Sequence, residues 1–230
     1  MPFFYIDRYY ILLVLPAALL SLWAQSKVNS TYAKYRNMRT NCGYSGQQIA
    51  RFLLDSYGLR DVNVVTVAGN LTDHYDPSRR VVRLSQDVFY GTSVAALGVA
   101  AHETGHAIQH AEGYVPLKIR TAIIPVTNFG SQLSMPMLFL GLILGIEPLV
   151  TFGILLFSLM TVFQFVTLPV EFNASTRAVD ALSAGLLTSE ELGGTKKVLT
   201  AAALTYVAAL IVSAMQLLRL VLLFGNRRRD

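Results

Sequence analysis

The 230-residue sequence contains few charged residues, four histidines and one cysteine. Asp, Glu, Lys and Arg make up 14% of the chain and apolar residues 53%, which argues against an ordinary soluble domain and favours insertion into a membrane. Cys42 has no partner for an internal disulfide, so nothing in the chain points to an oxidising compartment. We expect Cys42 to be a small buried hydrophobic residue.

The chain also lacks internal repeats, low-complexity tracts and a heptad pattern. Its net charge of +5 is compatible with nucleic-acid binding, but the basic residues lie beside apolar stretches and not on one aromatic-rich face. We therefore expect no nucleic-acid partner, and we interpret the basic residues as determinants of membrane topology.

Long apolar stretches without charge are what the sequence has in abundance. Those at 121–146, 148–170 and 198–218 are each long enough to cross a bilayer, and a shorter stretch covers 9–23. The shorter stretch resembles a secretory signal. However, Asp7 lies where a basic region is expected, and no small-x-small cleavage pattern follows Trp23, so we interpret it as a retained anchor. The chain is thus expected to contain about four transmembrane helices.

The polar stretch 26–118 is about the size of a small domain. Within it, "SGQQIARFLLDSYG" (45–58) predicts a helix that Ser45 caps and Gly58 ends. "VNVVTVAGNLTDHYDPSRRVVRLS" (62–85) has valine-rich runs separated by turn residues, which predicts a small antiparallel sheet. Residues 92–111 are expected to be helical, with Thr92 or Ser93 as the cap and Gly113 at the end. The predicted fold class is mainly α with a small β-sheet (α+β).

The stretch "AAHETGHAIQH" (100–110) carries the clearest chemical signal. His102 and His106 are four residues apart, so on a helix both imidazoles project from one face and can bind a single ion. Glu103 lies about 100° round the helix, where its carboxylate can reach a metal-bound water. Two imidazoles suit zinc, which lowers the pKa of that water, and the carboxylate can accept the proton during attack on a peptide carbonyl. We predict a site for one Zn²⁺ ion; the alternative is a polar patch on a helix.

A catalytic zinc site usually has three protein ligands. His110 continues the helix beyond the motif, and we expect it to be a surface or helix-end residue. Glu171, in "LPVEFNASTRAVD", lies at the end of an apolar span, where an acid is costly unless it is solvated or bound. A hairpin turning at 147–148 returns the chain to the side from which it entered, which favours Glu171 as the third ligand over Asp180, nine residues further on.

Four segments, "HYDPSRRVVRLS", "GVAAHETGHAIQH", "VEFNASTRA" and "AALTYVAAL", together resemble the YugP-type membrane zinc metallopeptidases of bacteria over nearly the whole chain. The resemblance implies that His102, His106 and Glu171 bind zinc and that Glu103 is the catalytic base. It also implies a zincin-like domain in a bacterial plasma membrane.

A more distant similarity is to the heat-shock-associated membrane proteases, in which an apolar hairpin also separates the helix motif from a third glutamate ligand. Those proteases have an acid four residues after that glutamate, whereas this chain has Ser175. Three residues therefore remain open as the group that orients a ligand histidine: Ser175, Arg177 and Asp180.

Several other positions are candidate contacts for a substrate. The strand 81–85, "VVRLS", comes directly before the motif helix, and as an edge strand it would pair with an extended peptide through Val82 and Leu84; a plain scaffold strand is the alternative. His74 is a candidate for polarising the substrate carbonyl, or else a hydrogen-bond partner in a turn. Tyr206 is a second candidate for that role, or else a buried tyrosine with its own partner.

Our leading hypothesis is a zinc-dependent integral-membrane endopeptidase that acts on a peptide or protein substrate associated with the membrane. The alternative is a non-catalytic metal-binding scaffold or partner-binding protein; a transporter is disfavoured, because the spans lack paired ionisable residues. The sequence gives no indication of oligomeric state. We expect five segments: an N-terminal transmembrane anchor (1–25), a catalytic region (26–118), a transmembrane hairpin (119–170), a third-ligand helix with a linker (171–197), and a C-terminal transmembrane helix with a basic tail (198–230).

The charge pattern predicts the orientation of these segments, because Lys and Arg in short flanks are retained on the cytoplasmic face. We expect the active site to face the cytoplasm. Arg8 and the arginines at 227–229 would lie on the opposite face, which conflicts with the same rule. The basic residues on the catalytic side outnumber them by eight to four: Lys27, Lys34, Arg36, Arg39, Lys118, Arg120, Lys196 and Lys197.

Overall fold

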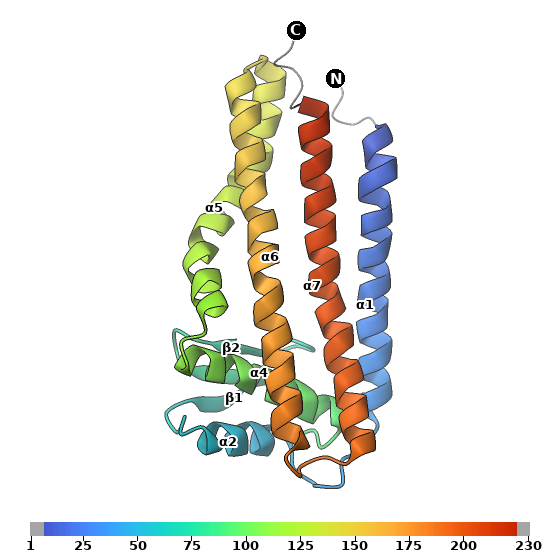
Figure 1. Cartoon of the computed structure of the whole chain (residues 1–230), viewed down its shortest axis with the longest axis vertical. Coiled ribbons are helices and arrows are strands. Elements are labelled where there is room, and N and C mark those ends of the chain that lie inside the picture. Colours follow the sequence, from blue (N-terminus) through green and yellow to red (C-terminus); the bar gives the residue numbers. More distant parts are fainter. Residues whose placement is uncertain (1–6, 225–230) are drawn as a thin grey trace. The chain divides into compact units, whose positions relative to one another are not determined.

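The computed structural model describes residues 7–224, which form long helices, several shorter helices and a three-stranded sheet (Figure 1). The predicted fold class, mainly α with a small β-sheet, is confirmed. Four long helices are apolar enough to cross a membrane: α1 (Leu15–Arg36) with the preceding π-helical turn η1 (Tyr10–Val14), α5 (Val115–Leu144), α6 (Glu147–Ser183) and α7 (Ser189–Phe224). The prediction of about four candidate spans is thus also confirmed.

The chain divides into two compact units, each described here by itself. The first comprises Ile119–Leu168 together with the described parts of Met1–Gln25 and Thr205–Asp230. The second comprises Ser26–Lys118 and Pro169–Leu204.

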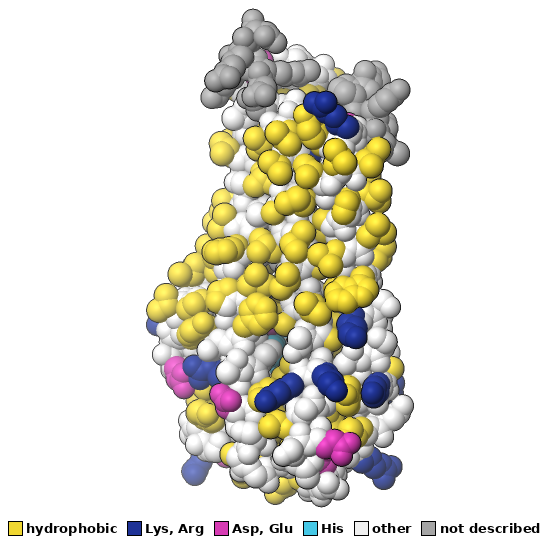
Figure 2. All heavy atoms as spheres, turned by 45° about the vertical axis from the view of Figure 1, so that its right-hand side comes forward, with side chains coloured by type: hydrophobic (Ala, Val, Ile, Leu, Met, Phe, Trp, Pro, Cys, Tyr) yellow, Lys and Arg dark blue, Asp and Glu magenta, His cyan; other side chains and the backbone are white. Residues whose placement is uncertain are grey.

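The first unit packs its helices around a small apolar core of Leu138, Val150, Phe157 and Leu220. Its outer surface is also apolar, and Figure 2 shows such side chains covering the long helices on the face in view. An apolar surface of this extent is typical of contact with lipid. The most exposed large side chains in this unit are Leu12, Leu22, Phe129, Ile143 and Phe165.

Within the first unit, one ion pair joins Asp7, near the start of the described residues, to Arg219 in the last helix. Arg219 of α7 donates from Nε to Asp7 over 2.9 Å and from a second nitrogen over 2.5 Å. The Asp7 carboxylate also accepts a 2.8 Å hydrogen bond from the backbone N–H of Tyr10. An acid and a base near a membrane segment are costly alone, and pairing reduces that cost.

The second unit holds the shorter elements: α2 (Gly46–Ser56), β1 (Asn63–Val67), β2 (His74–Asp76), β3 (Val81–Ser85), α3 (Gln86–Phe89) and α4 (Val94–Ala111). As predicted, Ser45 caps α2: its hydroxyl accepts from the N–H of Gln48, while the Gln48 side chain accepts from the N–H of Ser45. Ser93 caps α4 by accepting from the N–H of Ala96 over 3.2 Å.

The sheet has the order β1-β3-β2, with β1 parallel and β2 antiparallel to β3. The prediction of an antiparallel sheet is therefore wrong for β1, and strand 81–85 is central and not an edge strand. Burial explains its place: four of the five β3 residues, including Val82 and Leu84, are buried, whereas β1 has no buried residue. Strand β3 is paired on both sides along Val81–Arg83, so the structure does not support a substrate-pairing role for Val82, and the role of Leu84 stays a prediction.

Helix α4 crosses the C-terminal part of α6 within the second unit (Figure 1). The two helices touch at Gly105, where an added Cβ would lie 2.8 Å from the carbonyl oxygen of Ala174. Helix α6 continues from Glu147 to Ser183, with Pro169 inside it, so the expected apolar span and the helix carrying Glu171 form one element.

Gly105→Ala is expected to force α4 and α6 apart, because the new methyl group meets backbone that cannot rotate away. We expect a destabilisation of roughly 1–3 kcal/mol, visible as a lower unfolding temperature of the detergent-solubilised protein. The matched control is Gly193→Ala in α7, where a Cβ meets nothing within 4 Å. Alanine there should stabilise the helix by about 0.5–1 kcal/mol. Equal unfolding temperatures for both variants would contradict the close contact.

Candidate metal centre

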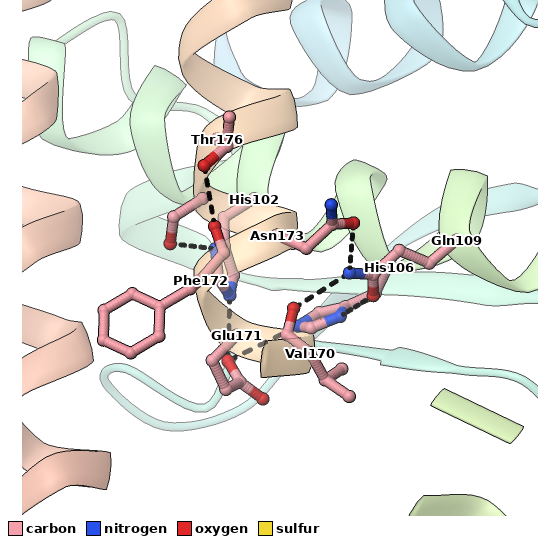
Figure 3. Close-up of polar contacts among 9 residues, drawn as sticks. His102, His106, Gln109, Val170, Glu171, Phe172, Asn173 and Thr176 are labelled. Atoms are coloured by element: carbon pink, nitrogen blue, oxygen red, sulfur yellow. Dashed lines mark hydrogen bonds and ion pairs between the residues drawn. The ribbon is translucent and has the colours of Figure 1, made fainter. Parts of the chain in front are cut away.

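Three predicted ligands come together where α4 crosses α6 (Figure 3). His102 and His106 project from α4, and Glu171 projects from α6. Nε2 of His102 lies 3.3 Å and Nε2 of His106 lies 3.6 Å from the same Glu171 oxygen. One ligand atom from each residue lies within 4.8 Å of the other two.

The two separations between a histidine and Glu171 fit a tetrahedral ion, and the third, between the two histidines, is at most 4.8 Å. Ligand atoms about 2.0–2.1 Å from tetrahedral zinc lie about 3.3 Å from one another, close to the 3.3 and 3.6 Å found here. Two imidazoles and one carboxylate form a donor set that catalytic zinc sites use, with the fourth position left for water or substrate. The residues present therefore fit zinc.

The second nitrogen of each histidine ring also has a partner, which is typical of metal-ligating histidines. Nδ1 of His102 lies 3.2 Å from the Ser175 hydroxyl, and Nδ1 of His106 lies 3.0 Å from Oε1 of Gln109. Of the three groups left open by the sequence, the structure thus places Ser175 beside a ligand histidine. Arg177 contacts Asn173 and Glu112, and Asp180 is exposed on α6.

Electrostatics in the cluster favour a bound cation. Burial disfavours the positive form of His106, but its hydrogen bond to Glu171 and the charges of Glu171 and Glu103 outweigh burial and raise the pKa of His106. The side chain of Glu171 is 3% exposed, so its charge is poorly screened by water. Carboxylates that stabilise an imidazolium in this way also stabilise a metal ion.

Glu103 follows His102 on α4 and is 8% exposed. Asp73, in the loop before β2, lies close enough to Glu103 for their charges to interact. Burial, together with the Glu103 charge, raises the pKa of Asp73, although hydrogen bonds from the backbone and hydroxyl of Ser85 act in the opposite direction. Asp73 therefore lies within electrostatic range of Glu103, the residue that follows His102 on α4.

Other predicted site residues lie away from the cluster or in the first unit. His74 is exposed, and its Nδ1 lies 2.8 Å from the carbonyl oxygen of Thr72. Its neighbour Tyr75 faces α4, where its hydroxyl lies 2.8 Å from Nδ1 of His110, so alternation along β2 directs His74 the other way. The structure therefore does not support the carbonyl-polarising role of His74. Tyr206 lies in α7 within the first unit, and its role stays a prediction.

Gln109, Asn173 and Asp73 were missed by the sequence reasoning. Gln109 is fully buried, and it follows His106 by three residues, so it lies on the same side of α4. That spacing was the available signal, because an amide at i+3 can reach a histidine ring on a helix. Asn173 and Asp73 gave no comparable signal, since the contacts of Asn173 with Gln109 and of Asp73 with Ser85 join residues distant in sequence.

A groove between α6 and α7 lies next to the cluster within the second unit. It has a volume of about 270 Å³, and Ser175, the partner of His102, forms part of its wall. Its lining is mainly apolar. The other lining residues include Phe172 and Val179 of α6 and Lys196, Leu199 and Ala203 of α7.

A His–His–Glu cluster beside a buried glutamate, in a chain with four candidate spans, is the arrangement expected of a membrane metallopeptidase. Comparisons with known proteins support the same class of protein. Residues 10–225 match the family described as "Putative neutral zinc metallopeptidase". The chain is also 52% identical over 223 residues to "Putative membrane protease YugP" of Bacillus subtilis (strain 168), covering 96% of this chain and 99% of that protein. The chain therefore belongs to this family, as its sequence motifs predicted. No solved structure gives a significant match.

Glu171→Gln is expected to weaken zinc binding by at least about 100-fold, because the amide oxygen is a poor ligand and the site loses its buried negative charge. Zinc content after purification and competition with a chromophoric chelator measure the effect. Asp180→Asn is the control, since it neutralises an exposed acid on the same helix. Unchanged zinc affinity in Glu171→Gln would rule out Glu171 as a ligand.

Proposed function

We propose that the protein is a zinc-dependent integral-membrane endopeptidase of the HExxH type. One zinc ion would be held by His102, His106 and Glu171, with Glu103 as the general base. The observation that carries this proposal is the convergence of three ligand atoms within 4.8 Å of one another beside the buried Glu103. Membership of a zinc metallopeptidase family and similarity to a membrane protease support it.

When bound, zinc supplies a Lewis acid that polarises the peptide carbonyl and makes water acidic enough to react near neutral pH. Glu103 accepts a proton from the attacking water. It then delivers that proton to the nitrogen of the breaking peptide bond, so that water adds across the C–N bond and the carboxylate is restored. Burial of Glu103 keeps bulk water from competing for the proton.

The substrate proposed for this site is a peptide or protein associated with the membrane. Strand β2 lies at the edge of the sheet, and its Tyr75 contacts His110 of α4. We propose that an extended substrate pairs with the free edge of β2, and not with β3. The groove beside Ser175 offers room for an apolar side chain of that substrate. Pairing through backbone would make cleavage tolerant of sequence, with the groove adding a preference for apolar residues.

Glu103→Gln is expected to lower peptide cleavage by about 10²–10⁴-fold while zinc content stays at the wild-type level, because the amide cannot accept the proton and Glu103 is no ligand. Cleavage of a fluorogenic peptide library and zinc analysis of the same preparations provide the two measurements. Glu190→Gln, an exposed acid in the first turn of α7, is the control.

Three results would contradict the proposed peptidase function. Folded wild-type protein that binds no zinc would rule out the metal site. Full activity in Glu103→Gln would remove the proposed base. If His102→Ala unfolded the protein and Glu103→Gln changed no measurable turnover, the metal would serve as a structural element of a non-catalytic scaffold.

We further propose that the second unit, with the active site, faces the cytoplasm of a bacterial cell. The support is the excess of basic residues in the flanks of the candidate spans on that side. In a Cys42→Ala background, a cysteine at the exposed position Gln47 of α2 should not react with a membrane-impermeant thiol reagent in intact cells. A cysteine at Ile146, between α5 and α6, should react, because one crossing separates the two positions. The opposite labelling pattern would place the active site outside.

A further inference from the structure

A continuous chain of hydrogen bonds joins the candidate ligand His106 to a salt bridge that includes an exposed acid. Nδ1 of His106 lies 3.0 Å from Oε1 of Gln109, and the Gln109 amide nitrogen donates to Oδ1 of Asn173 over 2.9 Å. Nε of Arg177 donates to the same Asn173 oxygen over 2.8 Å. A terminal nitrogen of Arg177 lies 2.7 Å from the Glu112 carboxylate. Figure 3 shows the inner part of this chain.

The chemistry of these groups determines the direction of every bond. Arg177 has donors only, so the group facing its Nε must be the oxygen of Asn173 and not its amide nitrogen. That oxygen accepts from Gln109, which must therefore present its NH₂ group. The second hydrogen of this NH₂ is donated to the carbonyl oxygen of Val170 over 2.8 Å. Both donors of Gln109 are thus used, and only its oxygen remains to face His106.

The orientation of Gln109 in turn selects the tautomer of His106. An amide oxygen can only accept, so Nδ1 of His106 must carry the hydrogen. In the neutral ring Nε2 then has its lone pair free, and this is the nitrogen that faces Glu171. Gln109 is fully buried, so the reversed amide would leave its oxygen facing two acceptors with no water to relieve the conflict.

His102 has no equivalent control. Its Nδ1 contacts the hydroxyl of Ser175, which can rotate to donate or to accept and so fits either tautomer. The two ligand histidines are therefore held differently, one by an adaptable hydroxyl and the other by a chain of groups with assigned directions.

We propose that Gln109 is a positioning residue that keeps Nε2 of His106 available to the metal, and that Asn173 and Arg177 set the orientation of Gln109. The proposal rests on the zinc site proposed above. Because Gln109 of α4 donates to Val170 and Asn173 of α6, these hydrogen bonds also tie the orientation of His106 to the helix that carries Glu171. Its loss should weaken the metal site while leaving the three ligands and Glu103 in place.

Two replacements of Asn173 separate this role from simple packing. Asn173→Asp keeps an oxygen that accepts from both Gln109 and Arg177, so zinc affinity should stay within about threefold of wild type. Asn173→Leu is similar in size but removes the acceptor, and it should weaken zinc binding by about 10–100-fold, the range known for partners of metal-bound histidines. Gln109→Met should do the same. Chelator competition measures the affinities, and the absorption spectrum of the Co²⁺-loaded protein reports the ligand geometry.

A direct readout of the tautomer is ring-nitrogen NMR of metal-free protein carrying ¹⁵N-labelled histidine, with His106 assigned by a His106→Asn variant. The neutral ring should hold its hydrogen on Nδ1 in wild type and Asn173→Asp, and should show both tautomers in Asn173→Leu and Gln109→Met. Equal zinc affinity in all four proteins, or equal weakening by Asp and Leu at 173, would overturn the proposal. A neutral wild-type ring with its only hydrogen on Nε2 would also overturn it. Failure of wild type to bind zinc, with the Nδ1 tautomer present, would instead refute the proposed function and the metal role together.

Discussion

The contact between Gly105 and the backbone of Ala174 is the constraint on which the candidate metal site depends. Two helices can approach this closely only where one of them has no Cβ. The residues three before and one after Gly105 are His102 and His106, and the residues at the same offsets from Ala174 are Glu171 and Ser175. Helical spacing on both sides of one contact therefore assembles the ligands and one of their partners.

This arrangement explains why a metal site can be built at the crossing of only two helices. Because the two backbones lie close together, short side chains can meet between them. Little side-chain conformational entropy is then lost when the ligands come together. Burial then keeps the carboxylate charge effective, because little water separates Glu171 from the rings. Gln109 and Ser175 complete the cluster from the same two helices, and no loop supplies any of these five groups.

Local signals in the sequence predicted much of this architecture. Ser45 and Ser93 mark the starts of α2 and α4 because their hydroxyls replace missing helical hydrogen bonds, and this effect depends only on neighbouring residues. The spacing of His102 and His106 is local in the same sense. Glu171 was predicted by a different argument, the cost of an acid at the end of an apolar span combined with the turn of the hairpin.

Apart from Gln109, the features that were predicted incorrectly or missed depend on contacts distant in sequence. The valine-rich runs 62–67 and 81–85 look alike, and only burial against the helices places β3 between its neighbours. For the same reason the edge position predicted for strand 81–85 is wrong. Ser175 could not be distinguished from Arg177 and Asp180, because each lies within three turns of Glu171 and only the crossing angle of α4 decides which reaches a ring.

Pro169 gives α6 a mechanical property that its composition alone does not suggest. Proline has no N–H, so α6 lacks one internal hydrogen bond just two residues before Glu171, and helices bend most easily at such points. The Pro169 carbonyl accepts a 3.4 Å hydrogen bond from Tyr114, and the residues beyond it are tied to α4 through Gln109 and Ser175. The segment that carries Glu171 therefore takes its position from its hydrogen bonds to α4, and not from the rigidity of α6 alone.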